Sequence, residues 1–162
     1  MDDCCAKPGL LPVETALQRL LKLADATPVN ASEEVALAAA DGRVLAQAVV
    51  AGLDLPPWDN SAMDGYALRL ADAGGEPLAV SQRIFAGTAP SPLQAGTCAR
   101  IFTGAPIPQG ADCVEMQESV ELLADGRVRF LQPLKERQHI RPQGQETRSG
   151  ETVLEAGTRV TP

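Results

Sequence analysis

Apolar residues near the start of the chain recur at the spacing of an amphipathic helix. The positions that share this face are Val13, Ala16, Leu17, Leu20, Leu21 and Ala24. Offsets of three and four residues keep them on one stripe of an α-helix. Pro28 ends the pattern, because the residue before a proline is driven out of the helical region. The sequence therefore predicts a helix over residues 13–26, whose leucine face needs a neighbouring lobe or a second subunit to cover it.

After this helix the pattern becomes one of short strands. Residues 30–50 mix alanine-rich and β-branched runs, and we interpret them as a strand at 34–37, a short helix and a further strand. From residue 51 onwards proline and glycine interrupt the chain every few residues. The runs between them predict strands at 66–70, 78–85, 97–102 and 113–117, a hairpin over 120–131, and a turn and strand over 149–162. Asp125-Gly126 predicts a tight primed turn in the hairpin. A small barrel or sandwich is typical of such spacing, so the predicted class is α+β and mostly β.

Composition and charge exclude several functions. The chain has 162 residues, of which 44% are hydrophobic and 22% charged, and its net charge of −7 disfavours binding to nucleic acid. A single histidine, His139, excludes a His-Glu-x-x-His zinc site and is more typical of a structural residue than of a base. No run is long and apolar enough to predict a membrane span, and the acidic start is unlike a secretory signal. We therefore predict a cytoplasmic protein that binds neither nucleic acid nor membrane.

The four cysteines do not form a metal-binding pattern. Cys98 and Cys113 lie in apolar, strand-like runs, where a free cysteine behaves as a small hydrophobic residue. Cys4 and Cys5 are adjacent, and we interpret them as residues of a frayed terminus. We expect structural roles for Cys98 and Cys113.

The densest group of polar residues lies between Asp54 and Tyr66. It contains three carboxylates, including Asp59 and Asp64, and an amide and a hydroxyl at Asn60 and Ser61. Oxygen-rich loops of this kind suit Mg²⁺ or the orientation of water. The alternative is that these side chains only bond their own backbone and that Asp64-Gly65 is a turn. The spacing by itself leaves both interpretations open.

Two further segments carry candidate chemistry. Thr103 and Gly104, in the sequence T-G-A-P, could present a hydroxyl and a backbone N–H to an anion, or they could form a rigid turn between strands. Arg141 could grip a phosphate, and Glu146 could bind a cation or pair with an arginine. The alternative for the second segment is a surface loop with an incidental ion pair.

Taken together, these segments resemble a known family. Residues 57–67 read P-W-D-N-S-A-M-D-G-Y-A, residues 100–106 read R-I-F-T-G-A-P, and G-A-D at 110–112 and I-R at 140–141 follow in the same order. The chain resembles the molybdopterin molybdenumtransferases, the MoeA family, which is related to the C-terminal domain of gephyrin. The resemblance runs from about residue 11 to the end.

The resemblance implies an enzyme that inserts molybdate into adenylylated molybdopterin and releases AMP in a Mg²⁺-dependent step. It implies catalytic roles for Asp64 and Thr103 and metal binding by Asp64 and Glu146. The substrate-binding residues that we predict from it are Asp59, Asn60, Ser61, Gly104 and Arg141. In the family's I-R-x-x-G-E-D segment this chain has glutamine and glutamate at 145 and 146, which removes one negative charge from the predicted metal site.

The same resemblance implies a layout and partners. Residues 1–50 and 143–162 would form an elongated lobe that dimerises. A β-rich, barrel-like lobe, residues 51–142, would be inserted in the sequence between these two segments. Pterin-binding and C-terminal domains would follow in a longer protein, so we expect this chain to be inactive by itself. The implied partners are a second copy of the protein and, upstream, a molybdopterin adenylyltransferase.

Two other functions stay open from the sequence. One is a non-catalytic dimerisation or interaction module, since the gephyrin relationship connects this fold with scaffolds. The other is a β domain that binds an oxyanion such as molybdate. Convergence of the Asp64 and Thr103 side chains on one exposed groove would favour the enzyme, whereas side chains that point into separate cores would favour the module.

Overall fold

The structure is a computed structural model, and it describes residues 11–29 and 31–162. Contacts divide the chain into one unit formed by Met1–Ala46 with Arg159–Pro162 and a second unit formed by Gln47–Thr158. These limits differ from the predicted lobes of 1–50 plus 143–162 and 51–142. The difference arises because the strands around residues 50 and 153 pair with each other and fall within the second unit. The lobes of the family layout stay a prediction, and Cys4 and Cys5 lie outside the described residues.

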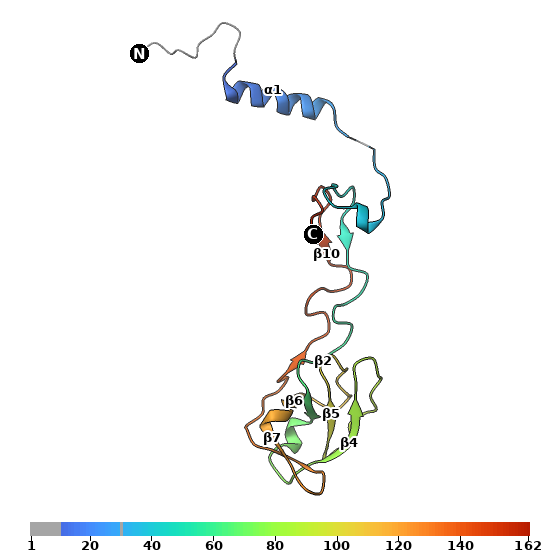
Figure 1. Cartoon of the computed structure of the whole chain (residues 1–162), viewed down its shortest axis with the longest axis vertical. Helices are drawn as coiled ribbons and strands as arrows, with labels where there is room; N and C mark the ends of the chain where they lie inside the picture. Colours follow the sequence, from blue (N-terminus) through green and yellow to red (C-terminus); the bar gives the residue numbers. More distant parts are fainter. Residues whose placement is uncertain (1–10, 30) are drawn as a thin grey trace, which may run out of the picture. The chain divides into compact units, whose positions relative to one another are not determined.

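Among its described residues the first unit contains one α-helix, α1 (Val13–Ala26), at the residues that the apolar spacing predicted (Figure 1). It begins after Pro12 and ends at Thr27, whose hydroxyl bonds the carbonyl of Leu23 at 2.9 Å. No side chain of α1 is buried in the described structure, and Leu20 is 63% exposed. The apolar face of this helix is therefore exposed within the described structure, and the predicted partner that would cover it stays a prediction.

The rest of the first unit is less regular than we predicted. The expected strand at 34–37 is wrong: residues 34–36 have no regular structure, and Leu37 begins a 3₁₀ helix, η1 (Leu37–Ala39). Backbone hydrogen bonds at Arg43 connect the two segments of this unit. The N–H of Arg43 donates to the carbonyl of Ala40, and the carbonyl of Arg43 accepts the N–H of Val160 at 2.8 Å. The alanine-rich run thus forms one short turn of helix. The backbone conformation after it is set by hydrogen bonding to Val160, a residue distant in the sequence.

The second unit is built on a four-stranded sheet with the order β4-β5-β3-β6 (Figure 1). Its strands are β3 (Gly65–Leu68), β4 (Ala79–Ile84), β5 (Thr97–Ile101) and β6 (Cys113–Met116), close to the four predicted runs. β4 and β5 are parallel, and β3 is antiparallel to both of its neighbours. β3 has no exposed residue because it lies between two other strands.

The two faces of this sheet cover two small cores. Ala67, Ile84, Ala99, Ile101 and Val114 lie in one, and Tyr66, Leu68, Cys98, Cys113 and Val128 lie in the other. Alternation along each strand produces this division, since neighbouring residues of a strand point to opposite faces. Cys98 and Cys113 are free and buried, and burial raises the pKa of each thiol to about 12. Their predicted structural role agrees with this burial.

Smaller strand pairs complete the second unit. They are β1 (Val49–Val50) with β10 (Thr152–Leu154), β2 (Asn60–Ser61) with β9 (Ile140–Arg141), and β7 (Val120–Leu122) with β8 (Val128–Phe130). Two 3₁₀ helices, η2 (Leu70–Asp72) and η3 (Gln117–Ser119), connect strands. The predicted α+β, mostly β class is confirmed, but the sheets are not closed into a barrel, since β4 and β6 end the order of the main sheet.

The turn of the β7–β8 hairpin differs from the prediction. A primed turn needs a positive φ at its first central residue, whereas only Gly126 has one here, at 83°. The Gly126 N–H donates to Leu123, and the Leu123 N–H donates to Arg127. This geometry is a type I turn closed by a glycine bulge, which Asp125 stabilises by accepting the N–H of Arg127 at 3.0 Å.

Candidate functional site

Asp64 and Thr103 meet at an exposed corner of the second unit. Asp64 directly precedes β3, and Thr103 follows β5, the strand that pairs with β3. The Oδ1 atom of Asp64 accepts hydrogen bonds from the backbone N–H and from the hydroxyl of Thr103, each at 2.8 Å. The antiparallel register, which pairs Gly65 with Ile101, brings together two residues that lie 39 positions apart in the sequence.

These hydrogen bonds set the charge state of Asp64. The backbone N–H of Thr103 and then its hydroxyl hold the pKa of Asp64 below its usual value of 3.8, and the positive charge of Arg100 adds a smaller contribution. Because the folded pKa is the lower one, these bonds stabilise the fold above pH 3.8 and lose that effect as the pH falls through the folded value. The corner therefore presents a carboxylate at neutral pH.

Replacing Thr103 by valine is expected to raise the pKa of Asp64 towards 3.8. The variant loses the hydroxyl bond but keeps the stronger contribution of the backbone N–H, so the pKa should stay below that value. NMR titration of the Asp64 carboxyl carbon measures the change. A Thr103→Ser variant, which keeps a hydroxyl, should titrate as the parent does; equal pKa values in all three proteins would contradict the assigned hydrogen bond.

Arg100 fixes the backbone around this corner. Its Nη1 donates to the carbonyls of Gly65 and Ile101 at 2.9 and 2.7 Å, and its Nη2 donates to the Oε1 of Gln117 at 2.5 Å. The N–H of Gln117 in turn donates to the carbonyl of Asp64 at 3.1 Å. The guanidinium also lies over the ring of Phe102, 4.3 Å from its centre. We assigned no role to Arg100 from the sequence, although a charged residue within an otherwise apolar strand is a signal for one.

The other residues of the acidic loop hold neighbouring segments in place. Asp59 accepts from Arg137 at 2.9 Å and from the N–H of Gln143 at 2.7 Å, and Asp54 accepts from the N–H of Ser149 at 2.8 Å. The Ser61 hydroxyl donates to the carbonyl of Met63 at 2.6 Å and is buried. The substrate-binding roles of Asp59 and Ser61 stay predictions, and the contacts that the structure gives these residues are structural.

Asn60 and Gly104 complete this part of the loop. Asn60 is 7% exposed, and its side-chain oxygen has no hydrogen-bond partner in the described structure. Gly104 has a φ of 80°, and its N–H donates to the carbonyl of Ser61 at 2.8 Å. The N–H of Gly104 is thus engaged within the protein, whereas Asn60 keeps an unused acceptor.

The segment around β9 pairs its own charges. Arg141 and Glu146 form an ion pair with each other through Nη2 and Oε1, and their predicted roles in substrate and metal binding stay predictions. His139 bonds the carbonyl of Val114 through Nδ1 at 3.1 Å, in agreement with a structural role. Among residues 11–29 and 31–162, no group of three or more histidine, cysteine or carboxylate side chains could hold a metal ion.

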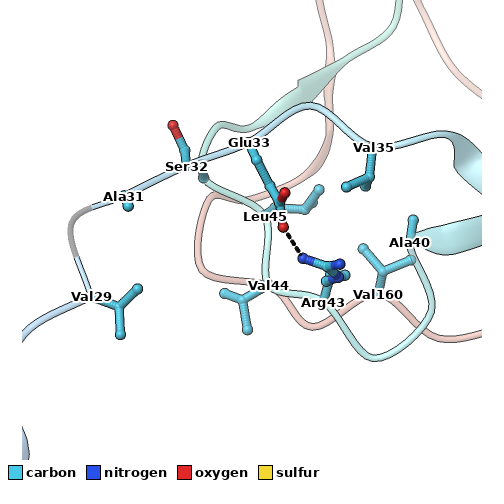
Figure 2. A pocket seen from close by; sticks show the side chains of 11 residues that line it. Val29, Ala31, Ser32, Glu33, Val35, Ala40, Arg43, Val44, Leu45 and Val160 are labelled. Carbon is cyan, nitrogen blue, oxygen red and sulfur yellow. Dashed lines mark hydrogen bonds and ion pairs between the residues drawn. The ribbon is translucent and has the colours of Figure 1, made fainter.

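A separate groove lies within the first unit (Figure 2). Glu33 and Arg43 form an ion pair there, and apolar side chains that include Val29, Val44 and Val160 line the rest. Its volume is about 400 Å³. The one acid of this lining, Glu33, is paired with Arg43, and the other lining side chains are apolar apart from Ser32, so we do not assign the chemistry of the protein to this groove.

Comparison with known families agrees with the motifs at this corner. Residues 11–162 match the family model described as MoeA N-terminal region (domain I and II). The chain belongs to the MoeA family. Both segments that meet at the corner, the acidic loop and the T-G-A-P turn, lie within the matched MoeA region.

Individual MoeA relatives are similar over most of this chain. It is 40% identical over 136 residues to a molybdopterin molybdenumtransferase of Haemophilus influenzae, covering 81% of this chain and 33% of the relative. The corresponding protein of Synechococcus elongatus is 39% identical over 162 residues, with 94% and 40% covered. This chain therefore spans about a third to two-fifths of the length of these relatives.

A solved structure shares the fold. The crystal structure of the molybdopterin biosynthesis MoeA protein from Pyrococcus horikoshii OT3 superposes with a TM-score of 0.84 at 36% identity. The match covers 94% of this chain and 41% of that protein.

No helix in the described parts of the chain is both long and apolar enough to cross a membrane.

Proposed function

We propose that this chain is the N-terminal part of an enzyme that inserts molybdate into adenylylated molybdopterin and releases AMP. The observation that carries the proposal is the hydrogen-bonded contact between Asp64 and Thr103, one from each of the two motifs that define the family resemblance. A carboxylate that is charged at neutral pH, exposed and held by a fixed donor pair is suited to orienting a ligand. The names of the relatives support molybdopterin as the substrate class.

The charges of the substrates support a role for Mg²⁺ at Asp64. Molybdate and an adenylate are anions, which a bare carboxylate repels. Thr103 occupies Oδ1, and no described residue donates a hydrogen bond to Oδ2, so this oxygen fits one ligand position of a metal ion. Mg²⁺ is commonly held by one or two carboxylates, with water and phosphate oxygens as its other ligands. When bound, it would offset the negative charge of the phosphate that leaves with AMP.

The chain's own residues would position this carboxylate. Thr103 orients Asp64 and keeps it ionised, while Arg100 holds the backbone on either side of it. Glu146 is paired with Arg141 through Oε1, and residue 145 beside it is glutamine and not a second acid. We therefore propose Asp64 as the principal metal-binding residue of this chain.

The reaction would belong to a longer protein. This chain covers 33% and 40% of two relatives, so the remainder of the pocket would come from residues beyond it. We propose a cytoplasmic homodimer, supported by the uncovered apolar face of α1, which receives its substrate from a molybdopterin adenylyltransferase.

Release of AMP tests the proposed function. The full-length protein, given adenylylated molybdopterin, Mg²⁺ and molybdate, should release AMP and produce molybdenum-loaded cofactor, whereas the 162-residue chain alone should release none. Omission of molybdate provides the control. A full-length protein that dimerises but releases no AMP would contradict the enzyme and favour a non-catalytic interaction module.

A further inference from the structure

A hollow with two arginines lies beside the main sheet of the second unit. Its volume is about 580 Å³, and residues of β3, β4, β5 and the β7–β8 hairpin line it. Arg83 of β4 and Arg100 of β5 contribute the two positive charges, and Tyr66 and Phe102 contribute rings. This size lies within the usual range for small-molecule sites.

An irregularity in β4 places Arg83 at this hollow. Val80 pairs with Cys98, but the next pair is Gln82 with Ala99, so one extra residue, Ser81, interrupts the register. Arg83 consequently stands opposite Arg100, on the face to which Cys98 points. Without the extra residue, alternation would turn this position to the other face of the sheet. Bulges re-aim side chains in this way and are frequent beside functional sites.

Arg83 and Arg100 stand opposite each other in the sheet, and neither forms a direct ion pair with a described residue. Two like charges repel each other, and only at longer range does Arg100 interact with the carboxylates of Asp64 and Glu118. In the hairpin that borders the same hollow, Arg127 and Arg129 are both paired with acids. An anion in the hollow would offset the charge of Arg83 and the part of the Arg100 charge that the two more distant carboxylates leave.

The donors that remain suit an oxyanion. Arg100 is half-buried and uses its Nη1 on two carbonyls and its Nη2 on Gln117, which leaves its Nε–H and one Nη2 hydrogen. Arg83 is exposed, and its side chain makes no hydrogen bond to a described residue. A guanidinium presents donors in a planar fork that matches two oxygens of a phosphate-type group.

We propose that Arg83 and Arg100 form a binding site for a tetrahedral oxyanion, supplied either as molybdate or as the phosphate of the nucleotide product. The inference rests on the proposed function for this choice of anions. Arg100 links the hollow to the corner, because the same guanidinium that lines it also bonds the carbonyls of Gly65 and Ile101. The site would thus hold an anion beside the Asp64 corner.

The test is titration of the purified chain with molybdate and, separately, with AMP and inorganic phosphate. Backbone and arginine side-chain NMR signals of Arg83, Arg100 and Tyr66 should shift saturably with at least one of these anions. Arg83→Ala should weaken that binding by about tenfold or more, whereas Arg83→Lys, which keeps the charge, should lose less. Arg100 is left unchanged, since its bonds hold the fold.

Arg148→Ala is the matched control, because Arg148 is also exposed and without an ion pair among the described residues. It removes the same charge and should leave the affinity unchanged. Equal weakening by the Arg83 and Arg148 variants, or shifts that never saturate, would overturn the site. Response to molybdate alone or to AMP and phosphate alone identifies the source of the anion. Since the readout is binding, a full-length protein that fails to release AMP would count against the proposed function and not against this site.

Discussion

The replacement Asp64→Asn in the full-length protein is expected to lower the rate of molybdenum insertion by about 100-fold or more. Asparagine keeps the shape of the side chain and can still accept the hydrogen bonds of Thr103, but it removes the charge that would hold Mg²⁺. The loss should appear in kcat at saturating Mg²⁺, while the thermal unfolding temperature changes little. Steady-state measurement of AMP release gives the rate, and circular dichroism gives the unfolding temperature.

Asp125→Asn is the matched control for this change. Asp125 is also an exposed aspartate that accepts a backbone N–H, from Arg127, and its pKa is likewise held below 3.8, first by that N–H and then by the arginine side chain. It lies in the β7–β8 hairpin, so its replacement should leave the rate within about twofold. A similar loss of rate in both variants would show that the rate depends on the total negative charge of the protein and not on the position of Asp64.

The second large effect is expected on stability. Gly65 follows Asp64 and lies in β3 against the backbone of β6, where an added Cβ would be 1.9 Å from the carbonyl oxygen of Glu115. The replacement Gly65→Ala therefore forces β3 and β6 apart and should lower the free energy of unfolding by about 3 kcal/mol. Urea denaturation of the parent and the variant measures the difference.

Gly75→Ala is the corresponding control for stability. No atom lies within 4 Å of a Cβ at Gly75, and its φ is not positive. Its free energy of unfolding should change by no more than about 0.5 kcal/mol. A Gly65→Ala variant as stable as this control would mean that β3 and β6 are not in the close contact described.

The sequence was informative where structure follows from local spacing. Helix α1 has the predicted bounds because its apolar period and Pro28 act over a few residues. The four strands of the main sheet were visible as short β-forming runs between prolines and glycines. Pairing over long distances was not visible, so the strand at 34–37 was mispredicted and β2, which bonds with residues about 80 positions later, was not predicted.

In the candidate site too, the sequence identified individual residues but not the long-range contacts between them. The motifs identified Asp64 and Thr103 as candidates, but only the register of β3 with β5 brings them into contact. The bonds of Arg100 to backbone carbonyls and the extra residue in β4 depend on the neighbouring strands, which no pattern in one strand reveals. The structural contacts of Asp59 with Arg137 and Gln143 belong to the same class.

The central claim is that Asp64 and Thr103 act as one unit in catalysis. The most direct measurement is a double-mutant cycle on the rate of AMP release by the full-length protein, with Asp64→Asn, Thr103→Val and the two combined. If Thr103 acts only by orienting the Asp64 carboxylate and keeping it ionised, the double variant should be no slower than Asp64→Asn alone. Losses that multiply in the double variant would contradict the account, since they would mean that the two residues contribute independently.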